Sequence, residues 1–324
     1  MPSLNALNKA LEKVNSDVFD GVHCHSSYIG LKKIDGKYTD EECVVIAVQV
    51  KLPEDELRAR NIPLVQAEYS FGGEKIKTDV VELPMMKPLI LYINPGESQA
   101  VFCHNSPVPS GVECTNERAN WVGTLGGMPM RLKDGRIVAL TNWHVGVVSG
   151  GKVGDRIVQP GAGRNDSERY QIGRLCRWNP ITSSKRNTMD VCLLNCYSER
   201  YKGSFVSHRM YSVGESSPDI ATPTLRQRVI KYGRTTSLTR GQVVGINAKT
   251  SVSYGSFVAT FYDQVVVEGV GTGFSAAGDS GSSTCEDGTL KKHSLLFAGG
   301  GGTTILSPVG PIKLWAEGEF IKVK

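Results

Sequence analysis

The stretch MPMRLKDGRIVALTNWH (residues 128–144) contains the clearest β-hairpin of the sequence. Asp134-Gly135 supplies the positive-φ residues that a tight hairpin turn requires. The second strand, residues 137–140, is continuously apolar, which predicts that both of its faces are buried. The strand ends at Thr141-Asn142-Trp143-His144. A lone histidine after a strand is more often an ordinary satisfied side chain than a catalyst, so His144 becomes a candidate only in combination with other residues.

Around this hairpin, strand signals recur from residue 120 to the end, with only a short helical pattern at 311–320. This pattern is typical of an all-β barrel or sandwich. We therefore read 120–324 as one β unit with an internal junction near 205–225. Residues 96–119 are predicted to be a linker, because two prolines and a glycine in HNSPVPSG (104–111) interrupt any strand pairing.

The first 95 residues have a different pattern. Apolar residues at helical spacing, with Ser3 placed as a cap, predict an amphipathic helix over 3–16, which packs either on its own chain or on a partner. β-Branched runs predict strands at 43–52 and 76–83, and the charged stretch 53–60 predicts a brief helix. We read 1–95 as a small α+β domain that regulates, docks or supports the rest.

The bulk composition excludes several classes of function. The chain has 324 residues and a net charge of +5 spread along its length, so we expect no nucleic-acid partner. No apolar run reaches the length of a membrane span, so we expect no membrane partner. Lys9, Glu12 and Lys13 interrupt the N-terminus where a secretory signal would need an apolar core. We expect a cytoplasmic protein whose eight cysteines are reduced thiols.

Two further motifs carry chemistry. Asp190 precedes the apolar run VCLL, and a partly buried carboxylate needs a partner such as an imidazole N–H. In GDSGSS (278–283) the glycines flanking Ser280 permit a strained turn and let successive N–H groups point at one spot, as an oxyanion requires. Taken alone, Asp190 is more often a turn or capping residue, and glycine-serine loops are common.

Together the three motifs are specific. Their order is His144, Asp190, Ser280, with separations of 46 residues (144 to 190) and 90 residues (190 to 280). LTNWHV, MDVCLL and GDSGS resemble the histidine, aspartate and serine motifs of the trypsin/chymotrypsin clan. More closely, the chain is similar to bacterial and phage trypsin-like peptidases, through GTLGG (123–127), VGDRIVQPG (153–161), KYGRTTSLTRGQV (231–243) and LLFAGGGGTT (295–304). A looser similarity extends over 20–95.

The resemblance implies a mainly β fold: two six-stranded antiparallel barrels of the chymotrypsin type, preceded by the α+β domain. It implies a serine endopeptidase acting on protein or peptide substrates without a cofactor. Ser280 would be the nucleophile, His144 the general base and Asp190 the residue that orients it, with the N–H groups of Gly278 and Ser280 as the oxyanion hole. The substrate pocket would be formed by residues that include Phe274, Ala298, Gly299 and Gly300.

This sequence also departs from the digestive enzymes of that clan. Phe274 stands where trypsin has the aspartate that selects basic side chains, so basic specificity is not expected. Val145 replaces a common disulfide cysteine. No activation sequence precedes the barrel, so we expect Asp279 to be held by another basic group or by a hydrogen-bonded turn.

Three alternatives stay open. His23, Cys24, His25, Cys43, Cys103, His104 and Cys114 offer ligands for a structural zinc, although no C-x-x-C pair occurs and our prediction is no metal. The chain could instead be a latent protease-fold protein whose N-terminal domain binds a regulator. The same triad also suits an esterase.

Overall fold

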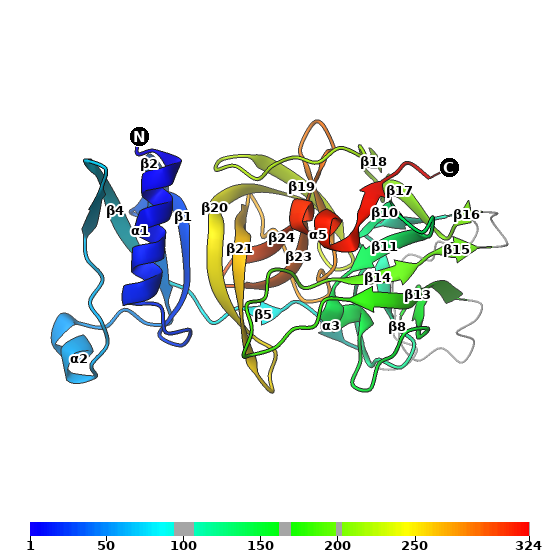
Figure 1. The fold of residues 1–324 in the computed structure, drawn as a ribbon, viewed down its shortest axis with the longest axis horizontal. Coiled ribbons are helices and arrows are strands. Elements are labelled where there is room, and N and C mark those ends of the chain that lie inside the picture. The colour runs from blue at the N-terminus through cyan, green and yellow to red at the C-terminus, as the bar shows by residue number, and fades with distance from the viewer. Residues whose placement is uncertain (94–106, 162–169, 199–202, 324) are drawn as a thin grey trace.

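The structure is a computed structural model that describes residues 1–93, 107–161, 170–198 and 203–323. Strands dominate it, and a helix lies near each end of the described chain (Figure 1). The prediction of a mainly β protein with an N-terminal helix is confirmed. Within these ranges, no helix has both the length and the apolar character needed to cross a bilayer.

The N-terminal region contains the helix, the strands and the brief helix that the sequence predicts. Its elements are α1 (Leu4–Asp17), β1 (Cys24–Ile34), β2 (Lys37–Val48), α2 (Glu54–Ala59), β3 (Glu68–Phe71) and β4 (Glu74–Glu82). Ser3 caps α1 by accepting a hydrogen bond from the N–H of Ala6 at 3.3 Å. The apolar face of α1 packs on its own chain, against β1, β2 and β4, which decides the alternative left open for this helix (Figure 1).

Two very short strands follow, β5 (Lys87–Pro88) and β6 (Leu91–Tyr92). The next described elements are β7 (Val108–Ser110), β8 (Glu113–Asn116), β9 (Trp121–Thr124), β10 (Gly127–Leu132), β11 (Ile137–Thr141), α3 (Trp143–Gly146), β12 (Arg156–Val158), β13 (Gln171–Trp178) and β14 (Cys192–Asn195). Then come β15 (Tyr197–Ser198), β16 (Gly203–Ser204), β17 (Val206–Met210), β18 (Gly214–Glu215), β19 (Arg228–Gly233), β20 (Ser237–Ser253), β21 (Val258–Gly269), β22 (Ser283–Glu286), β23 (Lys292–Gly300), β24 (Thr303–Pro308), α5 (Val309–Ala316) and β25 (Gly318–Phe320).

The predicted linker is the main difference between the sequence-based expectation and the fold. Part of 96–119 lies outside the described residues, but β7 and β8 fall within the rest of it. β7 pairs in parallel with β17 although Pro109 is its central residue. The N–H of Val108 donates to the carbonyl of Phe205 at 2.6 Å, and Pro109 occupies the position of this strand where no donor is needed.

Two large sheets organise the molecule. One has the order β25-β10-β11-β14-β13-β12-β8-β9-β6. The other has the order β19-β22-β23-β24-β21-β20-β1-β2-β4-β3, with β5 added to β23. An additional pairing between β19 and β20 closes the six strands from β19 to β20 into a ring.

The N-terminal strands extend this second sheet. β1 pairs antiparallel with β20 over Ser26–Gly30, so the region predicted as a separate domain shares a continuous hydrogen-bonded sheet with the remainder. The approach is close: a Cβ at Gly245 would lie 2.4 Å from the ring of Tyr28. The small residue in β20 therefore permits the packing of Tyr28 across the junction.

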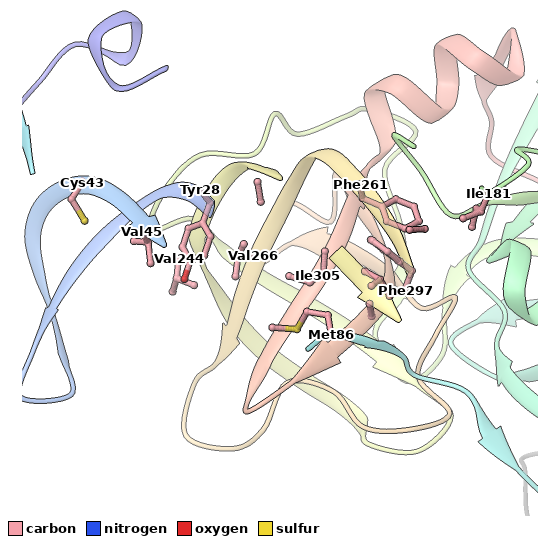
Figure 2. Packing of buried hydrophobic residues seen from close by; sticks show 14 residues of the cluster. Tyr28, Cys43, Val45, Met86, Ile181, Val244, Phe261, Val266, Phe297 and Ile305 are labelled. Atoms are coloured by element: carbon pink, nitrogen blue, oxygen red, sulfur yellow. The ribbon is translucent and has the colours of Figure 1, made fainter. Parts of the chain in front are cut away.

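One buried apolar cluster crosses this junction. It joins Tyr28 and Cys43 from the N-terminal strands to Phe261 and Phe297 from the ring. Figure 2 shows Cys43 and Tyr28 at the blue ribbons of the N-terminal strands and Phe261 and Phe297 among the yellow-to-red ribbons of the ring. Met86, which is fully buried, enters the same cluster from the segment that leads to β5 (Figure 2). The chain between the two regions is thereby fixed at the ring before it reaches β5.

Candidate active site

His144 and Asp190 come from neighbouring strands of the first sheet. His144 lies on α3, directly after β11, and Asp190 lies just before β14, which pairs with β11. The two side chains meet at 2.5 Å between His144 Nδ1 and Asp190 Oδ2, and both are buried. Asn142 holds the backbone of the aspartate by donating from Nδ2 to the Asp190 carbonyl at 2.7 Å.

Tyr254 is a third member of this group that the sequence did not indicate. Its hydroxyl donates to Asp190 Oδ2 at 2.6 Å, and its ring lies edge-on to His144 with centroids 6.0 Å apart. Burial and then the nearby Asp190 carboxylate raise the pKa of the Tyr254 hydroxyl well above its usual value. The hydroxyl therefore stays protonated and donates to the aspartate.

Ser280 lies in the tight turn between Phe274 and β22. Gly278 and Gly281 adopt φ angles of +100° and +96°, a region that side-chain-bearing residues rarely occupy. This turn directs the N–H groups of Gly278 and Ser280 to one acceptor, the carbonyl oxygen of Leu89, at 2.6 and 3.1 Å. The two groups expected to form an oxyanion hole thus hold a carbonyl of the chain itself.

The hydroxyl of Ser280 points toward backbone rather than toward the histidine. Ser280 Oγ donates to the carbonyl of Phe297 at 3.0 Å and accepts from the N–H of Leu89 at 2.8 Å. In the described part of the chain, Nε2 of His144 has no hydrogen-bond partner. The His144–Asp190 contact is therefore formed, whereas a Ser280–His144 hydrogen bond is not.

Asp279 is held both by a basic group and by a hydrogen-bonded turn, the two alternatives expected from the sequence. Lys231 Nζ lies 3.3 Å from its carboxylate, with both side chains fully buried. The turn at Thr235–Thr236 donates two N–H groups to Oδ1, and the Thr236 hydroxyl donates to Oδ2 at 2.6 Å. Burial lowers the pKa of Lys231, and the Asp279 carboxylate opposes that shift. This network fixes the turn that carries Gly278 and Ser280.

The four residues expected in the substrate pocket lie around Leu89 or on the strand that faces it. Phe274 is buried in an apolar cluster against which Leu89 packs, and Ala298 and Gly299 pair with Pro88 and Lys87 of β5. A Cβ at Gly299 would lie 3.1 Å from Cδ1 of Leu89. Gly300 lies one residue further, facing Pro84, where a Cβ would lie 3.2 Å from the proline Cγ.

A pocket of about 410 Å³ has His144 in its lining. Its lining includes Ile90, Trp121 and Trp143 and the β20–β21 turn at Tyr254–Phe257. His144 and Ile90, the residue after Leu89, therefore line the same pocket.

The zinc alternative finds no support in the described residues. Over those ranges, no three side chains of His, Cys, Asp or Glu converge on one point, and Cys103 and His104 lie outside them. The seven cysteines inside them are free thiols.

Comparison with solved structures gives matches to bacterial proteases at low identity. The chymotrypsin of Cellulomonas bogoriensis is 19% identical with a TM-score of 0.46, the match covering 67% of this chain and 99% of that one. Protease A of Thermobifida fusca is 15% identical with a TM-score of 0.48, covering 67% and 100%. No protein-family model and no curated protein matches the sequence. The chain is thus similar to bacterial chymotrypsin-like serine proteases over about two thirds of its length and has an additional region beside the match.

Proposed function

We propose that the chain is a serine endopeptidase with His144, Asp190 and Ser280 as its catalytic triad, on a double barrel of the chymotrypsin type. The observation that carries the proposal is the pair of N–H groups, Gly278 and Ser280, that converge on one peptide carbonyl. Such a pair is the device that stabilises an oxyanion, and a buried His–Asp pair close to the same turn supplies the base.

Each residue has a defined role in this reaction. Ser280 Oγ attacks the carbonyl carbon of the substrate while Nε2 of His144, which is unpartnered among the described residues, takes its proton. Asp190, bonded to Nδ1, orients the imidazole and stabilises its charged form. Tyr254 is a positioning residue, since its hydroxyl holds the Asp190 carboxylate that faces the histidine.

We expect specificity for an apolar side chain before the cleaved bond. Leu89 packs against a cluster of buried apolar residues: Val229, Val243, Val265, Val267, Phe274, Leu296 and Leu306. A lysine or arginine side chain would lose its hydration there without gaining a carboxylate partner. This agrees with Phe274 standing where an acidic residue selects basic substrates in trypsin.

A fluorophosphonate probe tests the nucleophile. Because Leu89 holds the oxyanion donors and Ser280 is buried, the probe is added at a urea concentration that displaces the Leu89 segment while the rest of the chain stays folded. Under these conditions we expect the wild-type protein to be labelled at Ser280 and Ser280→Ala to remain unlabelled. Ser256→Ala, which removes an exposed serine lining the pocket near His144, is the matched control and should label like wild type. Equal labelling of Ser280→Ala and wild type would contradict the assignment.

One observation also favours latency. The Leu89 carbonyl accepts from both oxyanion donors and the Leu89 side chain packs against the apolar cluster, so an external peptide has to displace this segment. A latent protease would show this arrangement as well, and its activity toward other peptides would then depend on removal of the Leu89 segment.

A further inference from the structure

The segment from Met86 to Tyr92 crosses the candidate active site in an extended conformation. Lys87 and Pro88 pair antiparallel with Gly299 and Ala298 of β23. The N–H of Leu89 continues this ladder toward the carbonyl of Phe297 at 3.4 Å. A strand added to an exposed sheet edge in this way is a general mode of peptide binding, with alternate side chains entering pockets.

The carbonyl oxygen of Leu89 occupies the proposed oxyanion hole. Its oxygen accepts the N–H groups of Gly278 and Ser280 at 2.6 and 3.1 Å. The Leu89 N–H lies 2.8 Å from Ser280 Oγ, so the hydroxyl is next to the same residue. A single residue therefore contacts both the oxyanion donors and the nucleophile.

The side chain of Leu89 packs against the buried apolar cluster that contains Phe274. A Cβ placed at Gly299 would lie 3.1 Å from Cδ1 of Leu89, so this glycine leaves room for the leucine. The surroundings of Leu89 are therefore suited to an apolar side chain.

The chain after Leu89 is also held. Leu91 and Tyr92 pair antiparallel with Val122 and Trp121 of β9. Ile90, between the two short strands, lines the same pocket as His144. The chain is thus paired with neighbouring strands both before and after the Leu89–Ile90 bond. His144 lies on the Ile90 side of this bond, where cleavage would release an amine.

We propose that Leu89–Ile90 is a peptide bond that the protein cleaves in its own chain, an inference that rests on the proposed function. Ser280 Oγ adds to the Leu89 carbonyl carbon as His144 Nε2 accepts the hydroxyl proton. The C–N bond then breaks, and His144 returns that proton to the nitrogen of Ile90. Water hydrolyses the resulting Leu89–Ser280 ester, leaving a carboxylate at Leu89, an amine at Ile90 and the serine restored.

In the proposed reaction the Ser280 hydroxyl has to turn from backbone to the histidine. Ser280 Oγ now donates to the Phe297 carbonyl, and rotation about χ1 would release it from this bond. His144 Nε2 has no competing partner in the described residues. The tethered segment stays positioned during this rotation, because β5 and β6 hold it at both ends. Such prior positioning makes an intramolecular reaction favourable.

The experiment follows the intact mass of purified full-length protein over time. Wild type should convert into fragments 1–89 and 90–324, and N-terminal sequencing of the larger fragment should begin Ile-Leu-Tyr. The reaction should be first order at every protein concentration, and Ser280→Ala should stay intact. Cleavage of Ser280→Ala at this bond, or a wild-type chain that stays intact, would overturn the proposal.

Pocket variants test the role of Leu89. Leu89→Arg places a charge against the apolar cluster that contains Phe274 and should slow cleavage by at least about 100-fold. Leu89→Met conserves volume and should still be cut. Leu314→Arg, on the exposed face of α5, is the matched control and should be cut like wild type.

A peptide added in trans separates this proposal from the proposed function. The peptide ELPMMKPLILYI copies residues 82–93 and is offered to Leu89→Arg, whose own segment fits the pocket poorly. Cleavage of the peptide between Leu and Ile, with an intact wild-type chain, would refute self-cleavage and leave the peptidase standing. If Leu89→Arg neither cleaves the peptide nor is labelled at Ser280, the peptidase itself is refuted.

Discussion

Lys231 and Asp279 form an ion pair directly beneath the turn that carries Ser280. Neither side chain is exposed, so each charge depends on the other and on the Thr235–Thr236 turn. Removing one partner of such a pair leaves a buried charge without compensation. We expect Lys231→Met to lower the free energy of unfolding by about 3–5 kcal/mol, measured by urea denaturation.

A surface pair gives the matched control for that measurement. Lys75 and Glu68 also form an ion pair, but the lysine side chain is 73% exposed. Lys75→Met should change the free energy of unfolding by less than about 1 kcal/mol. Equal effects of the two substitutions would show that the buried pair is not needed to hold the turn.

His293 predicts how stability depends on pH. Burial lowers its pKa from 6.5 to about 4, and its two ring nitrogens already contact Gln227 and Ser294. Between these two values the unfolded chain binds the proton and the folded chain does not, so stability falls as pH drops from 6.5 toward 4. The free energy of unfolding, measured by urea denaturation, should fall between pH 7 and pH 4.5 in both proteins. This fall should be smaller in His293→Gln than in wild type by about 2 kcal/mol. Parallel pH profiles for the two proteins would contradict this.

At the scale of elements, the β1–β20 pairing depends on a glycine. A Cβ at Gly245 would lie 2.4 Å from Cδ2 of Tyr28, whose ring is buried in the cluster across the junction. We expect Gly245→Ala to lower the free energy of unfolding by about 1–3 kcal/mol through overpacking. Gly310→Ala is the control, because a Cβ at Gly310 would have open space, and it should not lower the free energy of unfolding. A similar loss in Gly310→Ala would show that overpacking against Tyr28 is not the cause.

The elements that the sequence predicts are those with a strong local pattern. The hairpin at 128–144, α1 and the strands of the N-terminal region have periodicity, turn residues or a cap within a few residues. β5 and β6 are two residues each, too short for any period, and exist only because β23 and β9 lie beside them. The Pro-containing β7 falls within the predicted linker because its strand character also depends on a distant partner. That partner, β17, lies about 100 positions away in the sequence.

The candidate site shows the same division. His144, Asp190 and Ser280 are recognisable from motifs, since turn geometry and buried strands leave a local signature. Tyr254 has none, because its contact with Asp190 spans 64 residues. Leu89 lies 191 residues from Ser280, in an ordinary run of apolar residues at the end of the N-terminal region. Such contacts depend on tertiary packing, which one sequence does not specify locally.

At the scale of the whole molecule, the continuous sheet determines the fate of the N-terminal region once Leu89–Ile90 is cut. β1 stays paired with β20, and α1 and β2 stay packed around that junction, whether or not the chain is continuous. The fragment 1–89 would also keep β5 on β23 and its new carboxylate between the N–H groups of Gly278 and Ser280. The severed region therefore remains an inhibitor of external substrates after it has been cleaved.

This predicts different behaviour in native and denaturing conditions. After cleavage, fragments 1–89 and 90–324 should elute together in gel filtration and separate only in denaturant. Urea is then raised to a concentration at which fragment 1–89 dissociates while fragment 90–324 stays folded. This should increase the rate at which the peptide ELPMMKPLILYI is cleaved. The cleaved Gly245→Ala protein, with its weakened junction, should release the fragment at a lower urea concentration than cleaved wild type. Fragments that separate without denaturant, or a peptide rate that does not change on release, would show that the shared sheet does not retain the cleaved region over the site.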